Sequence, residues 1–180
     1  MSMDSEQALA LISSGRIDEA GRLAGKALQQ DPSDWHAHYA IGQFFRFSQD
    51  FPQACAALSR ANELAPRQPS VLLALAIARQ LNAEYAQAIN AIKLALEIDP
   101  DYVTAYNTLA MTQKLMGDHE KAAHNYDAGA KALARVIAQS LTNAEDTPRL
   151  PHWSSRNDLW TEFALFGATY LAVHASVESL

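Results

Sequence analysis

The histidines come closest to a chemical motif in this sequence. The segment HEKAAH, from His119 to His124, resembles the helix of a zinc protease, in which two histidines one helical turn apart share a metal. Here the second histidine comes one place too late, because a step of five residues turns about 140° around a helix. His36 and His38 stand two apart on a predicted helix, where side chains also diverge. We therefore expect no metal site.

No other catalytic signature stands out. The glycines are scattered, so no phosphate-binding loop is present, and no nucleophile motif frames the serines and histidines. Cys55, the only cysteine, excludes an intrachain disulfide and a cysteine-based zinc site, and its alanine neighbours favour a packed thiol. We expect a chain that is not an enzyme and needs no cofactor.

Composition narrows the class of protein. The chain has 180 residues and is 49% hydrophobic, with much alanine, which favours an all-α fold. A net charge of −6 without a Lys/Arg cluster argues against nucleic acid as a partner. The N-terminus lacks the features of a secretory signal. The longest uncharged stretch, residues 163–177, is shorter than the roughly 20 apolar residues of a membrane helix. We expect a cytoplasmic protein with no membrane insertion.

A period of 34 residues runs through most of the chain. Pro32, Pro66 and Pro100 stand in register at this spacing. Small residues recur at three places of the period: Ala8, Gly42, Ala76 and Ala110; Ala20, Ala54, Ala88 and Ala122; and Ala27, Ala61, Ala95 and Gly129. A break signal recurs near the fifteenth place, at Gly15, Gln49, Ala83 and Gly117. This regularity predicts an array of structural repeats.

Each repeat reads as two helices separated by the break. In the second repeat, Asp50 suits an N-cap with Gln53 three residues later, and Pro52 falls in the first helical turn. The second helix ends before the proline, which disfavours helical backbone in the preceding residue. Ala134 replaces the proline in the fourth repeat, so we expect that helix to continue to about residue 143. The recurring small residues allow the paired helices to approach closely.

These residues and spacings resemble the tetratricopeptide repeat, whose unit also has 34 residues, small residues at places 8, 20 and 27, and proline at place 32. The resemblance implies an all-α, right-handed α-α superhelix of four helix-turn-helix repeats plus a C-terminal capping helix. The units are 1–34, 35–68, 69–102 and 103–136. Asp4 and His38 stand where a large apolar residue is usual, so the first helix is expected to fray. Gly129 should weaken its helix by roughly 0.5–1 kcal/mol.

The resemblance also implies a concave groove lined by the first helix of each unit. The partner-binding residues it implies are His36, Tyr39, Gln43, Arg46, Leu73, Ile77, Gln80, Asn107, Met111 and Lys114. The first four also share one helical face by spacing alone. Such a groove could hold an extended peptide through amide hydrogen bonds, or an amphipathic helix over Leu73, Ile77 and Met111. The residues expected instead to pack between adjacent repeats are Phe47, Leu81 and Leu115.

The resemblance implies a non-catalytic adaptor or scaffold that binds other proteins. The sequence pattern suits a bacterial protein. Two alternatives stay open: a small acidic chaperone for a secreted or assembling client, and a regulatory or catalytic component with a site built across repeats. Some family members clamp the C-terminus of a heat-shock chaperone with lysine and asparagine residues. The corresponding places here hold Ser5, Leu9, Ala40, Ser70 and Ala74 or, one unit later, Tyr39, Gln43, Ala74, Thr104 and Thr108. We therefore expect no such clamp.

The end of the chain departs from the repeat. Residues 144–153 hold two prolines and read as a loop, and residues 154–180 carry an apolar stripe at helical spacing. This amphipathic helix could cap the last repeat, plug the groove, or form a homodimer interface. The residues of the possible tail interface are Trp153, Trp160, Phe163, Phe166 and Tyr170.

Overall fold

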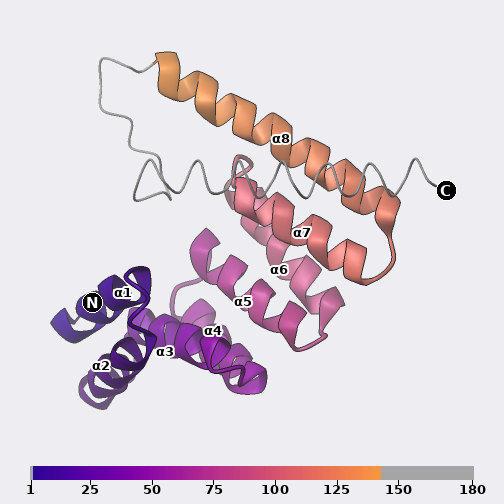
Figure 1. The fold of residues 1–180 in the computed structure, drawn as a ribbon. Helices are drawn as coiled ribbons and strands as arrows, with labels where there is room; N and C mark the ends of the chain where they lie inside the picture. Colours follow the sequence, from indigo (N-terminus) through magenta and orange to yellow (C-terminus); the bar gives the residue numbers. More distant parts are fainter. Residues whose placement is uncertain (1, 143–180) are drawn as a thin grey trace. The chain divides into compact units, whose positions relative to one another are not determined.

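A computed structural model describes residues 2–142 and the side chains of residues 2–139, and this part of the chain is built from helices alone (Figure 1). The helices are α1 (Met3–Ser13), α2 (Ile17–Gln30), α3 (Trp35–Phe47), α4 (Phe51–Leu64), α5 (Pro69–Leu81), α6 (Tyr85–Ile98), α7 (Val103–Leu115) and α8 (His119–Thr142). The expected all-α fold of paired helices is confirmed.

The helices group into two compact units. The first unit ends at Leu94 and the second begins at Ala95, so the boundary falls inside α6. In the first unit α1 packs on α2 and α3 on α4, and α2–α3 and α4–α5 contacts join successive pairs (Figure 1). In the second unit α7 packs on α8 around the buried side chains of Val103, Tyr126 and Leu133.

The recurring small residues lie where the helices come closest. The residues in register are buried in all four repeats: those that are alanine are completely buried, and Gly42 and Gly129 are buried as well. A Cβ added to Gly42 would lie 2.4 Å from Cγ of Leu58, and one added to Gly21 would lie 2.7 Å from the Phe44 ring. Real Cβ atoms do not approach other atoms so closely, so α3 and α4 pack at a distance that excludes even a methyl group at Gly42.

Each pair of helices is joined by the same tight turn. Gly15, Gln49, Ala83 and Gly117 all have positive φ, at 77°, 62°, 60° and 82°. In the second repeat, the N–H of Gln49 donates to the carbonyl of Arg46 at 3.2 Å, and the N–H of Asp50 donates to that of Phe45 at 2.9 Å. The other three turns repeat both bonds, which together form a Schellman motif. The sequence breaks are therefore confirmed at the predicted residues.

Two departures from the repeat pattern are compensated by polar contacts. The expected fraying of the first helix is wrong, because α1 is regular from Met3 and the hydroxyl of Ser2 accepts a hydrogen bond from the N–H of Ser5. The carboxylate of Asp4 lies 3.0 Å from the Lys26 ammonium on α2. A ring nitrogen of His38 lies 3.0 Å from the carbonyl oxygen of Pro32. Polar side chains at these places therefore bond to the neighbouring segment.

Two further helix signals read from the sequence appear in the structure. Asp50 caps α4 by accepting a hydrogen bond from the N–H of Gln53, with proline in the first turn. Helix α8 continues past Ala134 to Thr142. The guanidinium of Arg135, on this extension, lies 2.6 Å from the Asp101 carboxylate.

Replacing Gly42 by alanine should lower the free energy of unfolding by about 1–3 kcal/mol, because the new methyl group overlaps Leu58. The control is Gly25→Ala on α2, where an added Cβ meets nothing within 4 Å. This change should raise the free energy of unfolding by about 0.5–1 kcal/mol, since alanine restricts the unfolded chain more than glycine does. Urea denaturation measures both effects. Equal shifts for the two variants would contradict the close approach at Gly42.

Candidate functional site

A row of hydrogen-bonded polar side chains runs along one face of α3. Tyr39, Gln43 and Arg46 follow at steps of four and three, which places them on the same side of the helix. The amide Nε2 of Gln43 donates to the Tyr39 hydroxyl at 2.8 Å, and Nε of Arg46 donates to Oε1 of Gln43 at 2.7 Å. Gln43 is buried, and its two partners are half-buried. The buried Gln43 side chain therefore holds the other two in position through its hydrogen bonds.

Arg46 at the end of this row is a fixed cation. Its guanidinium carbon lies 4.3 Å from the centre of the Phe47 ring, within the range of a cation–π contact. Burial lowers the pKa of Arg46 from its ordinary value, and the nearby Tyr39 phenol offsets part of that effect. An arginine stays protonated at neutral pH all the same. Within the described residues no ion pair joins Arg46 to a carboxylate, so its outer nitrogens can serve a ligand.

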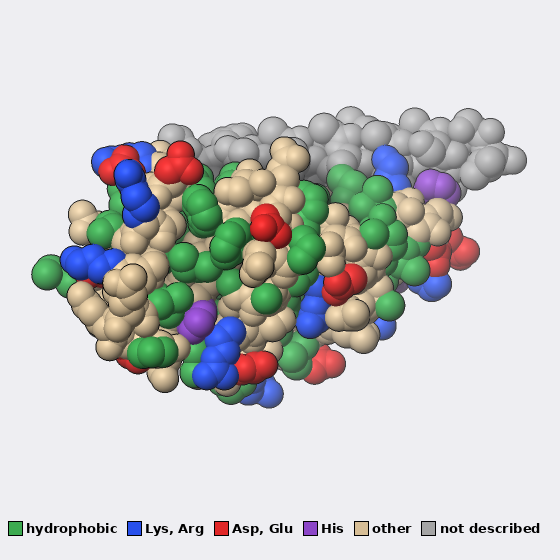
Figure 2. Space-filling view, turned by 90° about the horizontal axis from the view of Figure 1, so that it is seen from below, with side chains coloured by type: hydrophobic (Ala, Val, Ile, Leu, Met, Phe, Trp, Pro, Cys, Tyr) green, Lys and Arg blue, Asp and Glu red, His purple; other side chains and the backbone are tan. Residues whose placement is uncertain are grey.

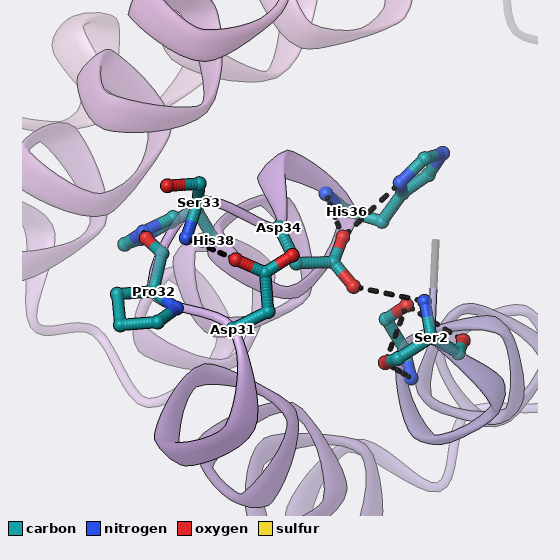
Figure 3. A network of polar contacts seen from close by, with 8 residues as sticks. Ser2, Asp31, Pro32, Ser33, Asp34, His36 and His38 are labelled. Atoms are coloured by element: carbon teal, nitrogen blue, oxygen red, sulfur yellow. Dashed lines mark hydrogen bonds and ion pairs between the residues drawn. The ribbon is translucent and has the colours of Figure 1, made fainter.

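His36 lies on the same face but is tied to the start of α3. Its Nδ1 lies 3.2 Å from Oδ1 of Asp34, and its ring stacks on Trp35 with 3.6 Å between centroids. The same carboxylate oxygen of Asp34 accepts the backbone N–H of His36 at 3.0 Å (Figure 3). The ring is therefore part of the helix cap as well as part of the exposed face.

Asp34 also joins α3 to the N-terminus of α1. Its Oδ2 accepts the backbone N–H of Ser2 at 3.1 Å, and Figure 3 shows the carboxylate between Ser2 and His36. Burial raises the pKa of Asp34, but hydrogen bonds from Ser2, Ser5 and His36 outweigh it and hold the pKa well below the usual range. The charged carboxylate thus fixes both helix starts.

Helix α5 adds a smaller set to the first unit. Ile77 and Gln80 are half-buried and retain accessible surface. Leu73 is only 5% exposed, so it belongs to the core and offers little surface to a partner. The described contacts place α5 against both α3 and α4.

The second unit carries the remaining predicted residues on α7. Asn107 is buried, and its Oδ1 has no hydrogen-bond partner among the described residues. Met111 and Lys114 are half-buried. Lys114 has no carboxylate partner in residues 2–139, in contrast to Lys121 and Lys131 on α8.

The apolar residues at the ends of α3, α5 and α7 differ from expectation. Phe47, Leu81 and Leu115 were expected to pack between adjacent repeats, and this is wrong: their exposed fractions are 53%, 46% and 54%. Each stands just before the tight turn, where the chain leaves the helix bundle. These residues add exposed apolar surface where packing between adjacent repeats was expected.

Several other expectations concern residues away from these faces. Trp153, Trp160, Phe163, Phe166 and Tyr170 lie outside the described residues, so the tail interface stays a prediction. His119 and His124 are both exposed on α8. Within residues 2–142 no three His, Cys, Asp or Glu side chains gather as a metal site would require, and no helix is long and apolar enough to cross a membrane.

The surface offers no single dominant patch on the face drawn in Figure 2. Hydrophobic side chains lie among polar ones, and basic and acidic side chains stand next to each other in several places (Figure 2). Recognition on such a surface depends on particular side chains rather than on a large field of one charge.

Comparison with known families decides the class. Models of the tetratricopeptide repeat match residues 11–78 and residues 91–124, which together cover more than half of the chain. The chain is a tetratricopeptide repeat protein. Its repeats form a protein-interaction module, since stacked helix pairs of this kind present extended surfaces for binding. A search of curated proteins by sequence finds no significant match.

Solved structures agree on the fold. MamA residues 41 to the end, from Desulfovibrio magneticus, is similar with 20% identity and a TM-score of 0.66 over 72% of this chain and 73% of that one. A crystal structure of MamA has 18% identity and a TM-score of 0.63 over 100% and 99% of the two chains. PilF of Pseudomonas aeruginosa has 19% identity and a TM-score of 0.65, over 72% of this chain and 59% of PilF. At such low identity the likeness concerns the tetratricopeptide fold alone.

Replacing Asp34 by asparagine should make the free energy of unfolding depend less on pH in the acidic range. The folded-state pKa lies below the unfolded value of about 3.9, so the carboxylate stabilises the fold above that pH. This contribution is lost as the pH falls through the folded-state pKa. The free energy of unfolding of Asp34→Asn should be about 1–3 kcal/mol lower than that of wild type at neutral pH. It should also change less than that of wild type when the pH is lowered.

Asparagine still caps a helix, so Asp34→Ala separates the loss of the cap from the loss of the charge. Denaturant unfolding at a series of pH values measures all three proteins. Parallel acid profiles for wild type and Asp34→Asn would contradict the role of the charge.

Replacing Gln43 by leucine should lower the free energy of unfolding by about 1–2 kcal/mol, because both hydrogen bonds of the α3 row are lost. Gln80→Leu is the control, since no described hydrogen bond involves that side chain, and it should stay within about 0.5 kcal/mol of wild type. Thermal and urea unfolding measure the difference. If Gln80→Leu costs as much as Gln43→Leu, the row does not hold the face together.

Proposed function

We propose that this tetratricopeptide repeat protein is a non-catalytic adaptor that binds an extended segment of a partner protein on the α3 and α5 face of the first unit. The observation that carries the proposal is the row of Tyr39, Gln43 and Arg46. Its side chains are held in place before any partner arrives, which lowers the entropy cost of binding.

Arg46 supplies the directional contact. Nε is used by Gln43, and the outer guanidinium nitrogens have no carboxylate partner within the described residues. A planar guanidinium binds a carboxylate, or backbone carbonyls, with two parallel hydrogen bonds. The ring of Phe47 supports its other side. We expect a carboxylate or a run of carbonyls of the partner at this position.

The contribution of α5 favours an extended segment over a helix. An amphipathic helix needs a broad apolar stripe. Leu73 is buried in the core, so α5 keeps two accessible large apolar side chains, Ile77 and, at the end of the helix, Leu81. Gln80 offers an amide that can bond to peptide backbone. In the second unit, α7 offers a similar set in Met111 and Lys114.

A chaperone for a secreted or assembling client is a second candidate. The exposed side chains of Phe47 and Leu81 favour it, because exposed apolar surface often marks contact with another protein. Co-expression discriminates the two: a client should be insoluble without a dedicated chaperone, whereas an adaptor's partner folds alone. The cytoplasmic location and bacterial origin expected from the sequence stay predictions, and the homodimer stays one of the three open alternatives for the tail.

Photo-crosslinking tests the proposed face. A photoreactive benzoylphenylalanine replaces Gln80 on α5 in one protein, and the exposed Arg60 on α4 in another. After irradiation in an extract of the source organism, we expect a discrete protein adduct from position 80 and none from position 60. Adding Ile77→Arg to the first protein should remove the adduct, because a charged side chain blocks the apolar contact.

Two outcomes would contradict the proposal. Adducts from position 60 alone would place the partner on α4. Equal adducts from both positions would mean that the partner does not prefer the α3 and α5 face. Circular dichroism of each variant confirms that the helical content is unchanged before the comparison is made.

A further inference from the structure

A recessed surface lies between α4, α5 and α6, within the first unit. We call it the α4–α6 hollow; its volume is about 430 Å³, and its lining includes Asn62 and Glu63 of α4, Leu72, Leu75 and Arg79 of α5, and Leu94 of α6. These residues are distinct from the α3 row. No residue of this lining belongs to the face proposed above to bind the adaptor's partner, although α5 contributes to both surfaces.

The hollow joins an apolar floor to an exposed apolar wall. Leu72 and Leu75 are almost completely buried, at 2% and 3% exposed. Leu94 is a large aliphatic side chain, and yet 37% of its surface is exposed to water. An apolar side chain of a ligand would cover Leu94 and rest on the floor, which removes apolar surface from water.

Arg79 gives the hollow an unpaired positive charge. Nη1 of Arg79 makes a long contact of 3.5 Å with the carbonyl oxygen of Gln87, and no ion pair joins the guanidinium to a carboxylate within the described residues. The acidic residue of the lining, Glu63, is already paired with Arg60 at 2.9 Å. The uncompensated charge beside the floor is therefore that of the Arg79 guanidinium, which suits a carboxylate.

Asn62 supplies an acceptor that lacks a donor. Its Oδ1 is buried with no hydrogen-bond partner among the described residues, which is a costly state for an amide oxygen. Asn62 lines the hollow, so a ligand bound there lies next to this amide. A backbone N–H of a peptide meets this need, whereas a fatty acid has no such donor.

From these groups we infer that the α4–α6 hollow is a second binding site, for a peptide segment that carries an aspartate or glutamate next to a large aliphatic side chain. The carboxylate binds Arg79, the aliphatic side chain packs on Leu72, Leu75 and Leu94, and a backbone N–H donates to Asn62. With two faces of different chemistry, one chain can hold two partner segments at once.

Fluorescence anisotropy with the full chain tests this site. The probe is a short fluorescein-labelled peptide of alternating leucine and aspartate, and the control peptide has asparagine in place of aspartate. We expect saturable binding of the acidic peptide that is at least about tenfold tighter than that of the control peptide. Arg79→Gln should weaken the acidic peptide by about tenfold, while Arg67→Gln, an exposed arginine outside the hollow, should leave it unchanged.

Asn62→Leu tests the acceptor separately. It should leave the melting temperature unchanged or higher, because the buried, unpaired amide oxygen is removed and an apolar group of similar shape takes its place. The same change should weaken binding of the peptide. In NMR titrations the side-chain amide signals of Asn62 and Asn90 should shift, and those of Gln43 and Gln80 on the other face should not.

Four results would overturn the proposal, three with the peptides and one with octanoate. The first is equal binding of the acidic and control peptides, and the second is acidic-peptide binding that Arg79→Gln does not change. The third is a set of amide shifts at Gln43 and Gln80 without shifts at Asn62. Octanoate, which has the carboxylate and the aliphatic chain but no N–H, should compete weakly; competition as strong as that of unlabelled peptide would identify a fatty-acid site instead.

Discussion

The close approach of paired helices is the constraint on which the rest of the structure depends. Glycine and alanine recur every 34 residues and are buried wherever they recur in the described part of the chain. At Gly42 the fit against Leu58 leaves no room for a methyl group. Because one side of each helix is committed to this contact, the opposite side is left to carry polar groups that need no place in the core.

Helix α3 shows how this constraint produces a binding face. Asp34 fixes its start to the N-terminus of α1, the turn at Gln49 fixes its end, and Gly42 fixes its distance from α4. A helix held at three points can keep Gln43 buried between Tyr39 and Arg46 without losing the hydrogen bonds of that row. The binding chemistry therefore follows from the packing of the other side of the same helix.

The architecture could be predicted from the sequence, but only part of the binding site could be. Period, breaks and caps are local, so Gly15, Gln49, Ala83 and Gly117 were correctly assigned to turns even though two of them are not glycine. A left-handed conformation costs a non-glycine residue about 1–2 kcal/mol, which the repeated turn bonds offset.

Side-chain burial was harder to predict, because it depends on contacts between helices that the spacing does not reveal. Phe47 was expected to pack between adjacent repeats and is exposed, whereas Leu73 was expected on the binding face and is almost completely buried. The α4–α6 hollow left no sequence signal at all, since Asn62 and Arg79 meet Leu94 only when three helices assemble.

The most direct test of this account is native-state hydrogen exchange of the full chain, measured residue by residue by NMR. If α3 is a rigid platform, the backbone amides from Tyr39 to Phe45 should exchange only through global unfolding, as slowly as those of α4. If those amides exchange through local opening, as fast as the amides of the turns, then the face is not fixed before binding and the central claim fails.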